Sequence, residues 1–171
     1  MSRYSIEPLT GEFRVFVDKQ IAEGWAGPFM VTRGVVHDTR THPGFIAREN
    51  EDPIGYTLYN FANGDCEITL LEILRENKGI GSALVNAVKA KAKKAGCRRV
   101  WLITTNDNTR AIRFYQRIGF TLRAVYINAL DEARKLKAQI PLTGCDGIPI
   151  AHEFEFEFLL GSDLGSDKGS V

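Results

Sequence analysis

The sequence has few cysteines and no long apolar run, and each absence narrows the range of possible functions. Cys66, Cys97 and Cys145 are odd in number and widely spaced, which argues against a disulfide framework and fits a reducing compartment. No run of about 18 apolar residues occurs, so no membrane-spanning helix is expected. Neither a Cys-x-x-Cys pair nor a histidine-rich cluster points to a metal site.

The sequence also lacks an excess of charge of either sign. It contains 22 Lys and Arg residues against 21 Asp and Glu residues, which gives a formal net charge of +1. This balance gives no support for a nucleic acid or another polyanion as partner. The N-terminal stretch MSRYSIEPLTGEF lacks the apolar core of a signal peptide. We therefore expect a cytoplasmic protein with no membrane association.

The length of 171 residues, 44% of them hydrophobic and 25% charged, suits one globular domain. No internal repeat or linker divides the chain. Residues 1–160 are expected to form this single domain. Residues 161–171 are rich in Gly, Ser and Asp, so we expect them to form a disordered tail.

The spacing of apolar residues predicts which segments form helices and which form strands. Before Gly79, β-branched and alternating segments predict one short helix and then consecutive strands in an antiparallel meander. After Gly79, helices alternate with strands, which makes the chain a mixed α/β or α+β domain. The expected helices cover about residues 13–23, 80–95, 106–119 and 129–139, and the expected strands cover 29–36, 45–48, 54–61, 66–74, 98–105, 121–127 and 154–160.

The stretch RENKGIGSAL places Gly79 and Gly81 where a strand passes into a helix. Such a junction exposes backbone N–H groups at a helix N-terminus, which is a site for phosphate or pyrophosphate. Lys78 would add charge at the rim, and Ser82 a hydroxyl donor. The order of residues matches neither a P-loop nor a dinucleotide fingerprint, whose third glycine position holds Leu84 here. A capped junction that binds nothing is the alternative.

A second segment, NTRAIRFYQRIGF, follows at the distance of one helix and one strand. It resembles the motif N-x-x-A-x-x-[FL]-Y-x-x-x-G-F of the GNAT superfamily of N-acetyltransferases. Gly79 and Gly81 also match the [QR]-x-x-G-x-[GA] loop of that family, although Glu76 stands at the Gln/Arg position. The resemblance implies the acyl-CoA N-acyltransferase fold, in which helices flank a mixed, mostly antiparallel central sheet. The matching residues of the second motif are Asn108, Ala111, Phe114, Tyr115, Gly119 and Phe120.

The resemblance also implies acetyl-CoA as cosubstrate and a set of residues that bind it. Amides of the glycine loop would hold the pyrophosphate, and the end of the preceding strand and Asn108 would bind the pantetheine arm. Tyr115 would be the general acid, because a phenol with a pKa of about 10 stays protonated at neutral pH and can donate to a leaving thiolate. The implied cofactor-binding residues are Leu71, Ile73, Leu74, Asn77, Lys78, Gly79, Ile80, Gly81, Ser82, Asn108, Ala111 and Phe114.

The general base is not specified by either motif. Glu67 and Glu72 precede the glycine loop and would lie on opposite faces of a regular strand unless a bulge intervenes. Glu72 is closer to the expected cleft and is favoured, and it could act through water. The alternatives are that either glutamate is a solvated strand residue, or that the amine needs no dedicated base. His37 and His42 lie in a polar loop that could cover the acceptor site, but we expect them to be surface residues and not catalysts.

The leading hypothesis is an enzyme that transfers an acetyl group from acetyl-CoA to a primary amine. The acceptor could be a small metabolite, an amino sugar, a polyamine, an antibiotic or a protein N-terminus. The alternative is a CoA-binding sensor that has lost catalysis, and another nucleotide-binding enzyme is a third reading that the missing fingerprints disfavour. A homodimer is compatible with the sequence, because the last strand is expected at a sheet edge and edge strands often pair.

Overall fold

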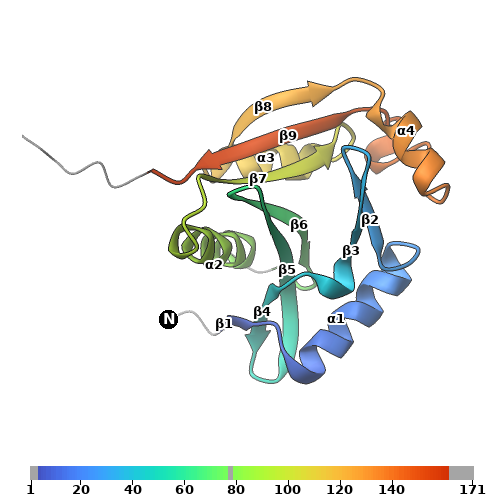
Figure 1. Cartoon of the computed structure of the whole chain (residues 1–171). Coiled ribbons are helices and arrows are strands. Elements are labelled where there is room, and N and C mark those ends of the chain that lie inside the picture. The colour runs from blue at the N-terminus through green and yellow to red at the C-terminus, as the bar shows by residue number, and fades with distance from the viewer. Residues whose placement is uncertain (1–3, 77–78, 162–171) are drawn as a thin grey trace, which may run out of the picture.

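The computed structural model describes residues 4–76 and 79–161 (Figure 1). Asn77 and Lys78 of the glycine loop, and residues 162–171 of the expected tail, lie outside the described residues. No helix in the described ranges is long and apolar enough to cross a membrane. The strands are β1 (Ser5–Pro8), β2 (Phe29–Thr32), β3 (Val35–Asp38), β4 (Gly44–Glu49), β5 (Asp52–Ala62), β6 (Asp65–Ile73), β7 (Arg99–Thr105), β8 (Thr121–Tyr126) and β9 (Glu153–Leu159). The helices are α1 (Gly11–Gly24), α2 (Ile80–Lys94), α3 (Thr109–Arg117) and α4 (Ala129–Leu136), with short 3₁₀ turns at Thr39–Thr41 and Cys145–Gly147.

Seven strands form one sheet in the order β1-β4-β5-β6-β7-β9-β8, and β2 and β3 form a separate pair (Figure 1). Every pairing in the larger sheet is antiparallel except that of β6 with β7. The strands β4, β5 and β6 form the expected antiparallel meander. The sequence does not predict the strand β1. The mixed, mostly antiparallel sheet flanked by helices is thereby confirmed.

Helices cover the two faces of the first half of the sheet (Figure 1). On one face, Val17 and Ile21 of α1 are fully buried in a cluster with Leu58 and other side chains of β4, β5 and β6. On the opposite face, Ile80 and Leu84 of α2 are fully buried against β4 and β5. Each of these side chains contributes about 1.5–3 kcal/mol by leaving water. Their packing fixes where α1 ends and where α2 begins, and both points border the site described below.

The segment 29–36 forms a hairpin of two strands and not the single strand that its apolar composition predicts. The strand β2 ends at Thr32 and pairs with β3 from Val35 onward. Arg33 and Gly34 between them have φ values of 49° and 72°. A two-residue turn with both φ values positive matches the right-handed twist of a hairpin, and glycine suits it best. The single Gly34 is therefore the only local signal of the turn.

The last strand, β9, lies between β7 and β8 and is not the expected edge strand. Glu153 and Glu155 of this strand are 2% and 3% exposed and do not face solvent. Alternation along a strand indicates two different faces, but it does not reveal the neighbours of the strand in the sheet. The edge strands of the sheet are β1 and β8. Because β9 is paired on both sides, it is not available for the edge-to-edge pairing on which the expected homodimer is based.

Candidate active site

A cavity opens in the sheet where β6 and β7 separate. Their parallel pairing covers only three residue pairs and ends at Ile68–Leu102, although β6 continues to Ile73 and β7 to Thr105. The cavity has a volume of about 470 Å³, which is in the range of small-molecule sites. Its walls come from both strand ends, α3, the hairpin β2–β3, α4 and the segment that follows α4. Its lining includes Thr32, Thr69, Leu71, Thr104, Asn108, Ala111, Tyr115 and Glu153.

The start of α2 has the form of an anion site. Gly79 is the N-cap residue with a φ of 90°, and the first bond within the helix runs from the Ala83 N–H to the Gly79 carbonyl at 2.9 Å. The N–H groups of Ile80, Gly81 and Ser82 precede that bond and therefore lack acceptors within the helix. They carry the positive end of the helix dipole. The three amides fit the pyrophosphate role that the resemblance assigns to them.

Gly81 allows α2 to approach α3 closely. A Cβ atom at position 81 would lie 3.1 Å from Cζ of Phe114, which is tighter than an ordinary contact. Phe114 therefore packs against the first turn of α2, and its ring lies 5.1 Å from that of Tyr115 in an edge-to-face arrangement. This contact connects the glycine loop to the second motif.

The end of β6 supplies part of the expected pantetheine contacts. Leu71 lines the cavity, and the edge of β6 beyond Ile68 is not paired with β7. The Leu74 N–H, however, donates to the Ile54 carbonyl at 3.0 Å and is already occupied. Ile73 is 37% exposed at the end of the strand. Of the three residues assigned from this strand end, Leu71 is the one brought to the cavity wall.

Asn108, the N-cap residue of α3, and Ala111 and Tyr115 of the helix itself line the cavity. The side-chain oxygen of Asn108 caps the helix by accepting the Ala111 N–H at 3.1 Å, which leaves the amide nitrogen available to a ligand. Tyr115 is 6% exposed among aromatic rings, and no described residue forms a hydrogen bond with its hydroxyl. Burial raises the pKa of Tyr115 well above its ordinary value, so the phenol is protonated at neutral pH.

A bulge in β6 brings Glu67 and Glu72 to the same face of the sheet. The pairing with β5 shifts from Leu58–Leu70 to Tyr59–Ile68, which leaves one extra residue in β6 between the two glutamates. Both side chains consequently reach the α1 and hairpin side of the sheet, where Glu67 accepts a hydrogen bond from β2 and Glu72 one from the end of α1.

The two glutamates differ in their surroundings. Glu72 accepts a short hydrogen bond from the Tyr56 hydroxyl and lies 3.5 Å from Nε1 of Trp25. Glu67 is 6% exposed and accepts a hydrogen bond from the Thr32 hydroxyl at 3.0 Å. Burial raises the pKa of Glu67 to about 7, against a smaller lowering by the bond from Thr32. Glu67 can therefore exchange a proton near neutral pH. Glu72, which the sequence favours as the base, instead accepts hydrogen bonds from Tyr56 and Trp25.

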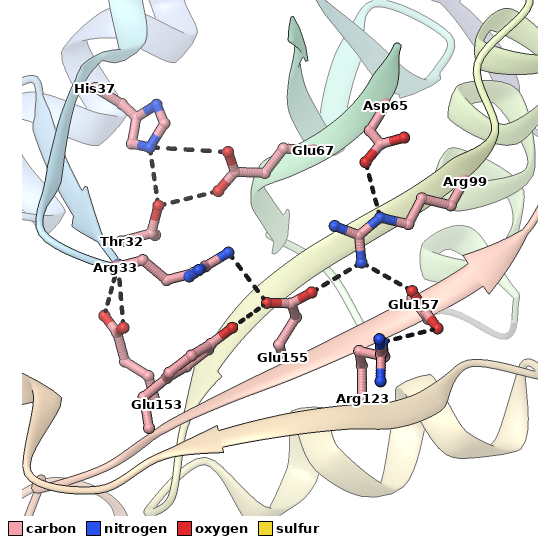
Figure 2. Close-up of polar contacts among 11 residues, drawn as sticks. Thr32, Arg33, His37, Asp65, Glu67, Arg99, Arg123, Glu153, Glu155 and Glu157 are labelled. Atoms are coloured by element: carbon pink, nitrogen blue, oxygen red, sulfur yellow. Dashed lines mark hydrogen bonds and ion pairs between the residues drawn. The ribbon is translucent and has the colours of Figure 1, made fainter. Parts of the chain in front are cut away.

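The two histidines are buried, so their expected place on the surface is wrong. His37 and His42 are 8% and 7% exposed, and burial lowers the pKa of both. Nε2 of His37 lies 2.8 Å from the Thr32 hydroxyl and 3.8 Å from Glu67 (Figure 2). The polar composition of this segment conceals that it folds back onto the sheet after β3. His37, Thr32 and Glu67 thus form one polar cluster beside the cavity.

Sequence reasoning also missed Glu153, which lines the cavity from β9. Both of its carboxylate oxygens face the backbone N–H of Arg33 at the hairpin turn, at 3.0 and 3.3 Å (Figure 2). Burial raises its pKa. The only sequence signal is the alternation of β9, which does not distinguish a buried glutamate from one that faces solvent.

Replacing Glu67 with glutamine is expected to stabilise the protein at pH 8 but not at pH 5. The folded state holds the Glu67 proton up to a pKa of about 7, whereas the unfolded chain loses it near 4.5. Stability that depends on this proton is therefore present below pH 4.5 and is lost as the pH rises toward 7. The gain at pH 8 is at most about 3 kcal/mol and is measured by denaturant unfolding at both pH values.

Glu155→Gln is the matched control with the opposite sign. Burial raises the pKa of Glu155, but hydrogen bonds from Tyr126 and Arg99 outweigh it and lower that pKa. The stabilising charge is present at neutral pH and is lost at acidic pH, so Glu155→Gln is expected to destabilise the protein at pH 8. A gain from Glu67→Gln that is equal at pH 5 and pH 8 would contradict the assignment to ionisation of Glu67.

Comparisons with known proteins identify the family of the chain. A family model described as the acetyltransferase (GNAT) family matches residues 14–120. YdhI of Bacillus subtilis (strain 168), an uncharacterized protein, is 43% identical over 136 residues, which are 79% of this chain and 85% of YdhI. A GNAT family acetyltransferase from Elizabethkingia anophelis, solved with acetyl-CoA bound, has a TM-score of 0.67 at 19% identity and covers 94% of this chain and 100% of its own. A Bacillus subtilis acetyltransferase in complex with CoA has a TM-score of 0.64 at 17% identity, with 92% and 98% covered. The likeness to the two structures lies in the fold, and the family match and the relative show that the chain belongs to the GNAT family of acetyltransferases.

Proposed function

We propose that this protein transfers an acetyl group from acetyl-CoA to a primary amine by direct attack of the amine. The observation that carries the proposal is the position of Tyr115, whose buried and protonated hydroxyl lies at a cavity that opens between β6 and β7. The GNAT structures solved with acetyl-CoA or CoA support acetyl-CoA as the donor.

Described residues offer the groups that a CoA thioester needs. The free amides at the start of α2 suit a pyrophosphate. Gly79, the N-cap residue, has no side chain that would keep an anion away from these amides. The unpaired edge of β6 and the amide nitrogen of Asn108 suit the peptide-like pantetheine arm. Ala111, with its small side chain, lines the cavity one helical turn from Tyr115.

The chemistry requires two proton transfers. The amine nitrogen attacks the thioester carbonyl carbon, so that a C–N bond forms and the C–S bond breaks. Tyr115 gives its phenolic proton to the departing sulfur and regains one from solvent. Glu67 receives the proton that the amine loses, through the Thr32 hydroxyl at the cavity wall, and returns it to solvent. A base with a pKa near 7 is matched to this task at neutral pH.

Two measurements test the proposal. Calorimetry with CoA, acetyl-CoA, ATP and NAD is expected to show binding of the first two ligands only. A thiol-release assay over a panel of primary amines is then expected to show amine-dependent release of CoA. Binding of CoA with no release for any amine would favour the CoA-binding sensor, and absence of CoA binding would contradict both.

A further inference from the structure

The three glutamates of β9 share one face of the strand but differ in their partners (Figure 2). Glu155 accepts hydrogen bonds from Arg33, Arg99 and the Tyr126 hydroxyl. Glu157 forms ion pairs with Arg99 and Arg123. Among the described residues, no cationic side chain forms an ion pair with Glu153. Of these three glutamates, Glu153 alone lines the cavity between β6 and β7.

Glu153 is held by one backbone N–H, and the charge of Arg33 offsets only part of the effect of burial on its pKa. It is 2% exposed, and its two oxygens accept only the backbone N–H of Arg33 among the hydrogen bonds of the described residues. That N–H is presented by the tight hairpin turn, where Arg33 has a φ of 49°. A buried carboxylate is costly unless an opposite charge or several donors compensate it. The hairpin thus orients a carboxylate whose remaining lone pairs are free to accept from a ligand.

The other charged side chains at the cavity wall are already engaged by the protein. Asp107 accepts hydrogen bonds from the Thr105 hydroxyl and the Cys145 N–H. The Lys137 ammonium donates to the backbone carbonyls of Trp25 and Phe29. Two carboxylates and one ammonium give the described cavity wall a net negative formal charge. Asp107 has two separate donors, whereas both oxygens of Glu153 share the single N–H of Arg33.

We propose that Glu153 binds a second cationic group of the acceptor, so that the acceptor is a diamine or a larger amine that carries another positive charge. This inference rests on the proposed acetyl transfer, because it concerns the same cavity. One amino group of the acceptor loses a proton toward the Thr32–Glu67 pair and then attacks the carbonyl carbon of the thioester. The other remains an ammonium and forms an ion pair with Glu153, which has none with the described residues.

Calorimetry of unreactive complexes tests the assignment. The protein saturated with CoA, and the protein alone, are titrated with a series of α,ω-diaminoalkanes of increasing length and with alkyl monoamines of matched length. The wild-type protein is expected to bind the best diamine at least tenfold more tightly than its matched monoamine. In Glu153→Gln, which keeps an oxygen acceptor for the Arg33 N–H, this difference is expected to disappear.

Glu157→Gln is the matched control, because Glu157 lies on the same strand face but outside the cavity lining. It is expected to keep the diamine preference of the wild type. Equal affinity for diamines and monoamines at every length, or a preference that survives in Glu153→Gln, would overturn the inference. Absence of CoA binding in the same titrations would instead contradict the proposed function, so the two failures are distinguishable.

Discussion

Replacement of Tyr115 with phenylalanine is expected to lower kcat by about 10²- to 10⁴-fold, which is the usual contribution of a general acid. The phenylalanine keeps the ring, which packs edge-to-face against Phe114 and Phe120 at 5.1 and 5.5 Å. It removes the hydroxyl, which forms no hydrogen bond with any described residue. The substitution therefore leaves no hydrogen-bond partner unsatisfied, and the stability of the fold is expected to stay close to that of the wild type. The thiolate then departs without a proton donor. Steady-state thiol release measures kcat, and calorimetry is expected to show CoA affinity close to that of the wild type.

Tyr59→Phe provides the control for this prediction. Tyr59 is 4% exposed and belongs to the same buried cluster as Tyr115, but it does not line the cavity. Loss of its hydroxyl is expected to leave kcat unchanged. Similar kcat losses in both variants would indicate a general effect of the core, and an unchanged kcat in Tyr115→Phe would remove Tyr115 from its role as acid.

The parts of the site that the sequence predicts are those contained in continuous motifs. The turn at Gly79, the cap at Asn108 and the position of Tyr115 each depend on a few neighbouring residues. Helical spacing then places Ala111 and Tyr115 on one face of α3. The fold class is predictable for a related reason, because the change from strand to helix spacing after Gly79 separates the meander from the alternating half.

The polar cluster beside the cavity is not predictable in the same way. Its members Thr32, His37 and Glu67 come from β2, β3 and β6, and Glu153 of β9 lies on the other side of the hairpin turn; only the tertiary fold brings these four residues near one another (Figure 2). Two local features decide their orientation, and neither has a strong sequence signature. The hairpin turn at Arg33 presents an N–H to Glu153, and the bulge in β6 reverses the side-chain alternation between Glu67 and Glu72. Strand spacing without a bulge would have separated these two glutamates.

Replacement of Gly79 with leucine is expected to weaken CoA binding by about 2–3 kcal/mol, or roughly 30- to 150-fold. Gly79 has a φ of 90°, a conformation that L-residues with side chains rarely adopt. A leucine there shifts the start of α2 and places a side chain beside the amides of Ile80 and Gly81. About two charge-assisted hydrogen bonds to a pyrophosphate would be lost. Calorimetry with CoA measures the change.

Gly96→Leu separates this loss of binding from a loss of stability. Gly96 follows the other end of α2 and has a φ of 76°, and no atom lies within 4 Å of an added Cβ. Each leucine is expected to cost about 1–2 kcal/mol of stability through the left-handed backbone conformation. Only the change at Gly79 is expected to reduce CoA affinity, because only that end of the helix presents free N–H groups. Equal losses of CoA affinity in the two variants would mean that the stability of α2, and not its N-terminal amides, controls binding.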